Sequence, residues 1–304
     1  MARVVTAHRI LVAGAGGFIG THLVRAALAR GLAVTALVRT RTARLNGATI
    51  VEADLTTADL PAILGRIKPS LIINAASYGV GANERDEARM SEVNLMAVRK
   101  LLDAAKATDV TRFIQLGTYS EYGDQPGAIS EDTPTAPKEA YARTKAEASS
   151  LITAPDVIGL VESIVLRLFN VWGPFERPHR LLPQVIRHCR KGARFPLTPG
   201  TQIKEWCYVE DVASWVMDIA FTSGSWPYRI VNLGSGVRLS VRDMALAVAN
   251  SLNGEHLLDF GAVQIPAKEV QTGPADLTRV NMLLPDRRFT PIAAGIAATI
   301  ATTP

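Results

Sequence analysis

The sequence predicts an α/β fold in which helices cover both faces of a doubly wound parallel β-sheet. Three observations support this prediction. Short apolar segments alternate with helical segments through the first half of the chain, a pattern typical of βαβ units. Two of these segments, at 71–74 and 112–116, show no polar alternation, as expected for strands buried on both sides. A glycine-rich loop directly follows the first apolar segment.

The glycine-rich loop indicates a Rossmann-type sheet that binds a dinucleotide. Residues 13–20 read Ala-Gly-Ala-Gly-Gly-Phe-Ile-Gly. Gly14, Gly17 and Gly20 let the backbone approach a phosphate, and the helix predicted at 21–30 would direct its N-terminus at a pyrophosphate. A strand before the loop and a helix after it are the context that this fingerprint requires. A strand-to-helix turn without a ligand is the alternative, because glycine tolerates positive φ.

The other elements are predicted from apolar periodicity and from the positions of glycine and proline. The predicted strands are 10–13, 33–38, 49–52, 71–74, 113–116, 163–167 and 229–233. The predicted helices are 21–30, 57–67, 84–109, 139–154, 209–221 and 240–252.

The regular alternation fades after Asn170. Segments 171–205 and 255–290 are rich in proline, which indicates a small irregular lobe. We therefore predict a Rossmann domain over 1–170 and a C-terminal substrate lobe over 171–304. Elements near 206–236 are expected to return to the Rossmann domain, so the lobe is interleaved with the sheet domain.

Composition narrows the class of protein. With 48% hydrophobic and 20% charged residues among 304, the chain builds a substantial core. No apolar segment approaches the roughly 18 residues of a membrane span, and the first eight residues are too short and polar for a signal peptide. The net charge of +5 is scattered, which argues against a nucleic-acid partner. Two cysteines fit a reducing compartment, so we expect a cytoplasmic protein without a metal site.

A second motif carries candidate chemistry. Tyr141 and Lys145 lie four residues apart on a predicted helix and share a face. A nearby ammonium lowers a tyrosine pKa from about 10, which makes the phenol a usable acid or base. An exposed amphipathic pair would have the same spacing. Thr118, at the carboxyl end of a predicted buried strand, offers a hydroxyl where such folds bind ligands, although a turn residue would look alike.

The ordered set of motifs resembles the extended short-chain dehydrogenases/reductases, in their group of nucleotide-sugar epimerases, dehydratases and reductases. The resemblance runs over nearly the whole chain. It rests on the glycine loop and on the set Thr118, Tyr141 and Lys145. It also rests on segments in the family's order, namely Asp54-Leu55, Asn74-Ala75-Ala76, Asn94, 166–174, 208–212 and 231–236.

The resemblance implies roles for these residues. Tyr141 would exchange a proton with a sugar oxygen, Lys145 would lower the pKa of Tyr141 and hold the nicotinamide ribose, and Thr118 would hydrogen-bond the same oxygen. The cofactor would be bound by Gly14, Gly17, Phe18, Ile19, Gly20, Asp54, Leu55, Ala75, Ala76, Asn94, Tyr141 and Lys145. A nucleotide-diphosphate sugar would be bound by Thr118, Asn170, Leu182 and Lys204.

The family also suggests the rest of the substrate lobe and the assembly. Lys204 stands where many relatives carry an arginine, and a lysine is a point charge instead of a fork. The sugar pocket is expected near 177–190 and 262–276, where Lys268 is a candidate for a second cation. Many relatives form a homodimer through helices that correspond to 90–108 and 139–154 here.

The end of the predicted second strand favours NADP as the cofactor, with NAD as the alternative. An NAD site places a carboxylate there for the ribose 2′-hydroxyl. Here Val38 stands at that position and Arg39 follows, so an arginine would accept a 2′-phosphate. In the alternative, Arg39 and Arg41 are solvated loop charges.

The family includes dehydratases, reductases and 4-epimerases. The dehydratases of the family carry an acidic residue two positions after the threonine. This chain has Ser120 at that position, and its first acidic residue after Thr118 is Glu121. Dehydration is therefore disfavoured. The sequence Glu-Tyr-Gly at 121–123 resembles reductases of nucleotide-linked 4-keto-6-deoxy sugars, so the favoured reaction is NADPH-dependent reduction at C4. A 4-epimerase that retains NAD is the alternative, and a non-catalytic dinucleotide-binding regulator is the third hypothesis.

Overall fold

The structure is a computed structural model that describes residues 9–81, 83–155, 157, 160–264 and 273–304. The described residues form two compact units. The first unit is drawn from Met1–Glu121, Pro137–Arg167 and Ala213–Val231. The second unit is drawn from Tyr122–Ala136, Leu168–Val212 and Asn232–Pro304.

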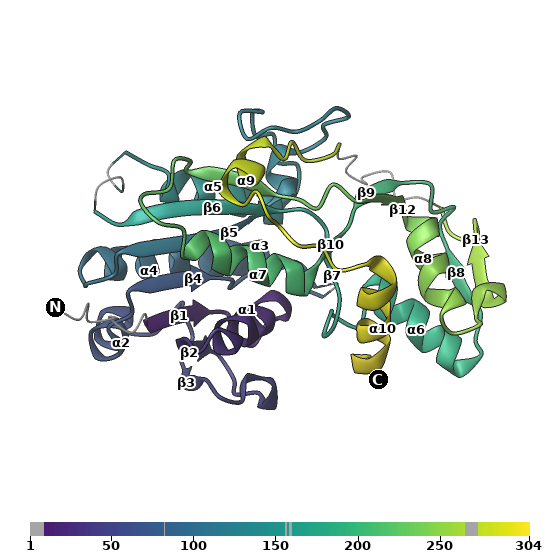
Figure 1. The fold of residues 1–304 in the computed structure, drawn as a ribbon, viewed down its shortest axis with the longest axis horizontal. Helices are drawn as coiled ribbons and strands as arrows, with labels where there is room; N and C mark the ends of the chain where they lie inside the picture. The colour runs from purple at the N-terminus through teal and green to yellow at the C-terminus, as the bar shows by residue number, and fades with distance from the viewer. Residues whose placement is uncertain (1–8, 82, 156, 158–159, 265–272) are drawn as a thin grey trace. The chain divides into compact units, whose positions relative to one another are not determined.

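A seven-stranded parallel sheet forms the centre of the first unit (Figure 1). Its strand order is β11-β6-β5-β4-β1-β2-β3. Ile10 of the inner strand β1 pairs with Val34 on one side and with Leu71 on the other. The strands are β1 (Arg9–Ala13), β2 (Ala33–Val38), β3 (Thr49–Glu52), β4 (Leu71–Asn74), β5 (Arg112–Thr118), β6 (Glu162–Leu168) and β11 (Ile230–Leu233). The predicted α/β fold of Rossmann type is confirmed.

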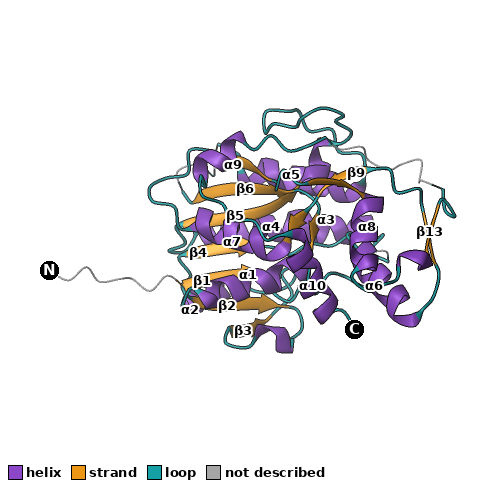
Figure 2. Ribbon diagram, turned by 45° about the vertical axis from the view of Figure 1, so that its right-hand side comes forward, coloured by secondary structure: helices purple, strands orange, loops and turns teal. Residues whose placement is uncertain are grey.

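Helices cover both faces of this sheet (Figures 1 and 2). On one face, Arg30 at the end of α1 pairs with Asp218 of α7 at 2.7 Å. On the other, α2, α4 and α5 pack against the strands around Leu64, Leu101 and Phe113, which are fully buried. The helices of this unit are α1 (Phe18–Ala29), α2 (Leu60–Ile67), α3 (Glu87–Ser91), α4 (Ala97–Lys106), α5 (Ala140–Ile152) and α7 (Val209–Ala220).

Helix α1 begins earlier than predicted, at Phe18 instead of residue 21. Gly17 is its N-cap, and Gly20 therefore lies in its first turn. A Cβ on Gly20 would lie 2.2 Å from the carbonyl oxygen of Gly14. The helix starts inside the glycine loop because only a glycine permits this close packing of helix on strand.

The helix predicted over 84–109 is interrupted. Helix α3 begins at Glu87, with Asp86 as its N-cap, and a π-helical segment at Glu92–Met96 separates α3 from α4. Short π-helical segments occur frequently at functional sites. This segment contains Asn94, whose side chain is fully buried.

The second unit is more regular than the sequence predicted. Helix α6 (Leu181–Lys191) lies within the proline-rich segment 171–205, and its Pro183 falls in the first turn, where a missing N–H costs nothing. The other helices are α8 (Val241–Asn250), α9 (Thr278–Leu283) and α10 (Ile292–Thr302), and the short strand pairs are β7 (Val171–Trp172) with β10 (Cys207–Tyr208), β9 (Ile203–Glu205) with β12 (Arg238–Ser240), and β8 (Phe195–Leu197) with β13 (Leu258–Phe260).

A separate apolar core holds this second unit together. Trp172, Val185 and Met244 are buried in it, and Ile296 of α10 joins them. No helix in the described ranges has the length and apolar character needed to cross a bilayer.

Candidate active site

The glycine loop and the end of β4 meet at the carboxyl edge of the sheet. Gly14 has φ +72°, and a Cβ there would lie 2.5 Å from the Cα of Ala76. The amide of Ala75 donates to the carbonyl of Ala13 at 2.9 Å, and that of Ala76 donates to the Asn74 side chain at 3.1 Å. Four predicted positions (Gly14, Gly20, Ala75 and Ala76) thus form one closely packed backbone cradle.

The N-terminus of α1 completes this cradle. Gly17, its N-cap, has an extended backbone, and no side chain caps the helix. The amides at the start of a helix, together with its dipole, favour a bound phosphate. The described residues therefore fit a dinucleotide, because side chains are absent where a pyrophosphate would approach and Phe18 and Ile19 begin the helix behind it.

The carboxyl end of β2 carries no acid. Val38 is 3% exposed and faces Gly16, on which a Cβ would lie 3.6 Å from the valine Cγ1. The side chain of Arg39 is exposed, and no hydrogen bond or ion pair within the described residues engages it. Arg41, by contrast, pairs with Glu52 at 3.4 Å.

Asp54, predicted at the adenine end, is held by its neighbours. Its Oδ1 accepts the amide and hydroxyl of Thr56 at 2.9 and 2.8 Å, and its Oδ2 lies 3.0 Å from Nη2 of Arg89. The Thr56 amide is the main cause that lowers the pKa of Asp54, with Arg89 adding to it. Sequence analysis missed Arg89, since nothing in the spacing shows that α3 reaches the end of β3. Leu55 packs against the apolar core of the first unit.

Asn94 connects three segments near the candidate site. Its Oδ1 accepts the amide of Tyr78 at 2.9 Å. Its Nδ2 donates to the carbonyl of Tyr78 at 2.8 Å and to the hydroxyl of Thr144 at 3.1 Å. The loop after β4, the π-helical segment and α5 are therefore fixed to one another by one buried side chain.

Lys145 is a buried cation beside the end of β5. It is 3% exposed, and its Nζ donates to the carbonyl oxygen of Leu116 at 2.5 Å. Burial lowers the pKa of Lys145 to about 8, and the charge of Glu121 acts in the opposite direction. The half-buried Tyr141 lies one helical turn before Lys145 on α5.

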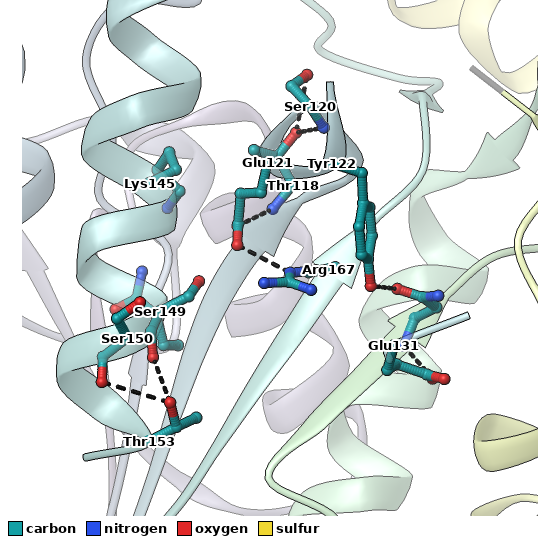
Figure 3. Close-up of polar contacts among 12 residues, drawn as sticks. Thr118, Ser120, Glu121, Tyr122, Glu131, Lys145, Ser149, Ser150, Thr153 and Arg167 are labelled. Carbon is teal, nitrogen blue, oxygen red and sulfur yellow. Dashed lines mark hydrogen bonds and ion pairs between the residues drawn. The ribbon is translucent and has the colours of Figure 1, made fainter. Parts of the chain in front are cut away.

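Thr118 ends β5 and is 8% exposed. Its Oγ1 accepts the amide of Ser120 at 3.3 Å, and its own amide donates to Glu121 Oε1 at 2.8 Å. Figure 3 shows that Glu121 contacts Thr118 on one side and Arg167 on the other, with Lys145 on the neighbouring helix. The three predicted catalytic residues thus belong to two elements of the first unit, which are in contact through Lys145 and β5.

Glu121 does not take part in this site as a free acid. Its side chain is fully buried, its Oε2 lies 2.8 Å from Nε of Arg167, and its Oε1 is occupied by Thr118. The sequence places these residues 46 positions apart, and sequence analysis did not connect them.

Apart from Thr118, the predicted substrate residues belong to the second unit. The Asn170 side chain accepts a hydrogen bond from Arg180 at 3.4 Å, and Arg180 also pairs with Glu176 at 3.1 Å. Burial raises the pKa of Glu176 to about 6, and Arg180 opposes this shift. Arg180 lies within the segment 177–190 where the sugar pocket was expected, although the sequence did not single it out, and Glu176 was missed.

The other predicted positions of the substrate lobe are placed differently. Leu182 is 1% exposed in the core of the second unit, and the half-buried Lys204 lies on β9 opposite Leu239. Lys268 and most of the expected pocket segment 262–276 lie outside the described residues.

Neither cysteine is a nucleophile of this site. Cys207 is buried and Cys189 is half-buried, and burial raises the pKa of both thiols. Among the described residues, no group of three or more histidine, cysteine or acidic side chains is arranged to hold a metal ion.

The chain belongs to the NAD-dependent epimerase/dehydratase family, whose model matches residues 10–234. The low-salt glycan biosynthesis protein Agl12 of Haloferax volcanii is 28% identical over 288 residues, which cover 90% of this chain and 92% of that protein. The dTDP-6-deoxy-L-talose 4-dehydrogenase (NAD(P)(+)) of Kitasatospora kifunensis is 30% identical over 248 residues, which cover 78% of this chain and 76% of that protein.

A solved structure gives the same picture of the fold. MoeE5 in complex with UDP-glucuronic acid and NAD has a TM-score of 0.84 at 28% identity, and the match covers 96% of this chain and 98% of that one. The resemblance predicted from the motifs is confirmed, and the chain is an enzyme of this family.

Proposed function

We propose that this enzyme reduces the C4 ketone of a nucleotide-activated 4-keto-6-deoxyhexose, with NADPH as the preferred cofactor. The observation that carries the proposal is the carboxyl end of β2, where Val38 is buried and Arg39 is exposed and unengaged among the described residues. An arginine at this place suits the 2′-phosphate that distinguishes NADPH from NADH. A reductase consumes its cofactor at every turnover, which suits NADPH.

The proposed roles are those that the family resemblance implies for Thr118, Tyr141 and Lys145. A bound nicotinamide would supply the hydride. Tyr141 donates the proton that the new alkoxide at C4 requires, and Thr118 directs its hydroxyl at the same oxygen. With a pKa of about 8, Lys145 is mostly protonated at neutral pH. Its ammonium stabilises the phenolate that forms when Tyr141 has donated its proton.

The state of Glu121 argues against dehydration. Elimination of water needs an acidic side chain that is free to exchange a proton with the sugar. Both carboxylate oxygens of Glu121 are already engaged, by the Thr118 amide and by Arg167. Tyr119 and Ser120 stand at the positions between Thr118 and Glu121, so no other acid follows Thr118 directly.

The Kitasatospora relative supports a reaction at C4. Its name describes a 4-dehydrogenase that uses NAD(P)+ on a dTDP-linked 6-deoxysugar. A 4-dehydrogenase and a 4-ketoreductase approach the same equilibrium from opposite sides. The substrate class of this relative is therefore the one proposed here.

A 4-epimerase is the second candidate. NAD in the complex of the related MoeE5 favours it, because an epimerase returns the hydride to its own substrate and has no need to exchange its cofactor. In that reaction Tyr141 would first accept the hydroxyl proton and later return it.

One assay separates these candidates. The purified enzyme is mixed with NADPH and a nucleotide-linked 4-keto-6-deoxysugar, and the absorbance of the reduced nicotinamide is followed. The reductase consumes one NADPH for each sugar. A second mixture contains one C4 epimer of the corresponding nucleotide-linked 4-hydroxy sugar and no added cofactor. Its conversion to the other C4 epimer on tightly bound NAD, with no consumption of NADPH in the first mixture, would contradict the reductase and support the epimerase.

The variant Tyr141→Phe tests the proton donor in the same assay. We expect turnover to fall by about 10²–10⁴-fold, the usual contribution of general acid–base catalysis. Binding of NADPH, followed by its fluorescence, should stay within a few-fold of that of the unmodified enzyme. Undiminished turnover would refute the role assigned to Tyr141.

A further inference from the structure

A buried ion pair lies next to Thr118. Oε2 of Glu121 and Nε of Arg167 are 2.8 Å apart, and their side chains are 0% and 4% exposed. The other oxygen, Oε1, accepts the amide of Thr118 at 2.8 Å. Figure 3 shows how the pair connects the end of β5 to the neighbouring strand β6.

Stability alone does not account for this pair. Removing two charges from water costs several kcal/mol for each ion, and well-packed apolar side chains of similar volume are often as stable or more stable. An apolar pair, however, would leave the Thr118 amide without its acceptor. It would also remove the negative charge that acts on Lys145 and opposes the effect of burial.

The backbone before Thr118 is shaped around the pair. A Cβ on Gly117 would lie 2.7 Å from Oε1 of Glu121 and 3.2 Å from Cγ of Arg167. The glycine therefore leaves the space that lets the carboxylate reach the next amide. Ser120 adds a second restraint, because its amide donates to the Thr118 hydroxyl.

We propose that Glu121 and Arg167 are positioning residues that fix the backbone of Thr118, and thereby direct its hydroxyl toward the sugar oxygen. Arg167 holds the carboxylate, and the carboxylate holds the Thr118 amide. This inference rests on the proposed function, in which the Thr118 hydroxyl contacts the substrate.

Two double variants separate the positioning role from the stabilising one. Glu121→Leu with Arg167→Met removes both charges and the acceptor for Thr118. Glu121→Gln with Arg167→Met also removes both charges, but its amide oxygen can still accept the Thr118 amide. We expect the first to lower kcat about 10- to 100-fold, which is less than the roughly 10²–10³-fold cost of removing a transition-state donor, because the Thr118 hydroxyl is displaced and not removed. We expect the second to recover most of this loss. KM for the sugar should change less than kcat.

A matched ion pair provides the control. Arg112 and Glu162 join the same two strands at their amino ends, also at 2.8 Å, and ligands bind at the carboxyl ends. Arg112→Met should lower the unfolding midpoint while kcat, measured well below that midpoint, stays unchanged. If both double variants lose activity only in proportion to their unfolding midpoints, the pair is merely structural and the inference is overturned.

A double-mutant cycle tests the route through Thr118. In a Thr118→Ala background there is no hydroxyl to direct, so Glu121→Leu with Arg167→Met should lower kcat by little more than Thr118→Ala alone. Additive losses would overturn the inference, since groups that act through one another are not additive. A Thr118→Ala variant that retains full turnover would instead contradict the proposed function.

A measurement without turnover keeps the two failures apart. Hydrogen exchange of the Thr118 amide, followed in threonine-labelled protein, should be accelerated at least 10-fold in Glu121→Leu with Arg167→Met and unchanged in Arg112→Met. Unchanged protection would overturn the inference whatever the enzyme's substrate. If the unmodified enzyme does not reduce the nucleotide-linked 4-keto-6-deoxysugar, the proposed function fails, while loss of protection would still support the contact between Glu121 and the Thr118 amide.

Discussion

The surroundings of Lys145 lower the affinity of its side chain for a proton. Lys145 is 3% exposed and lies at the end of β5, and burial lowers its pKa from 10.5 to about 8. Below pH 8 the folded enzyme therefore keeps a buried ammonium, which the proposed reaction uses, at a cost to the free energy of unfolding. Above pH 8 that cost declines, and the ammonium is lost with it.

The lowered pKa of Lys145 should make the free energy of unfolding depend on pH. Between about pH 8 and 10.5 the unfolded chain binds more protons at Lys145 than the folded one, so stability rises with pH across this window. The contribution is at most about 1.4 kcal/mol per pH unit. Urea unfolding from pH 7.5 to 10 should give a steeper increase for the cofactor-free enzyme than for Lys145→Met. Equal slopes would mean that the pKa of Lys145 is not lowered.

Arg39 should decide the choice of cofactor. We expect Arg39→Asp to raise KM for NADPH relative to NADH by about 10- to 100-fold, because a charged hydrogen bond contributes about 1.5–3 kcal/mol. Arg41→Asp is the matched control, since Arg41 already pairs with Glu52, and its effect should be smaller. Kinetics with both cofactors measure the ratio, and an unchanged ratio for Arg39→Asp would remove the argument for NADPH.

At the scale of single elements, the start of α1 depends on contact between backbones. Gly20 in its first turn faces the carbonyl of Gly14, where a Cβ has no room. Gly65 lies in the last turn of α2, and a Cβ there would meet nothing within 4 Å. Gly20 therefore has no room for a side chain, whereas Gly65 does.

Replacing each glycine by alanine should have opposite effects. Gly20→Ala should displace α1 from the cradle, lower the unfolding midpoint and weaken NADPH binding at least 10-fold. Gly65→Ala should raise the free energy of unfolding by about 0.5–1 kcal/mol, since alanine is the better helix former. Denaturant unfolding and cofactor fluorescence measure both. A Gly20→Ala enzyme that binds NADPH normally would show that the cradle tolerates a methyl group.

At the scale of the whole molecule, the family resemblance predicts a homodimer, and one exposed side chain offers a test of it. Met96 is 50% exposed at the end of the π-helical segment, within the range that the family resemblance implies for a homodimer. We expect the enzyme to be a dimer by light scattering and Met96→Glu to be a monomer at micromolar concentration. Met282→Glu, on the 67% exposed Met282 of α9, should remain a dimer. A monomeric unmodified enzyme would contradict the prediction.

Much of the sheet was predictable because most of its inner strands are buried on both sides. Leu71–Asn74 is buried throughout and Ala33–Val38 is buried from Val34 onward, and the limits of both were predicted as the structure has them. The cradle was predictable for a related reason, since three glycines at fixed spacing after a strand have few other uses.

The rest depends on contacts between distant residues. Nothing local shows that Arg167 lies beside Glu121, or that Arg89 reaches Asp54. Proline misled the prediction at α6, because the same residue that breaks a helix interior is harmless in its first turn. Helix α10, rich in alanine, was not predicted at all, although alanine favours helix.

The π-helical segment at Glu92–Met96 has a consequence for how this chain tolerates changes of length. A π turn holds one residue more than an α-helix would place there, and here the surplus coincides with Asn94, which binds the Tyr78 backbone and the Thr144 hydroxyl. Deleting Asn94 would restore an ordinary helix, and the turns that follow would keep their direction because the π turn already takes up the surplus residue. The helix would gain regular hydrogen bonds, but the side-chain bonds that join the loop after β4 to α5 would be lost. A shorter, more regular helix would therefore make a poorer enzyme.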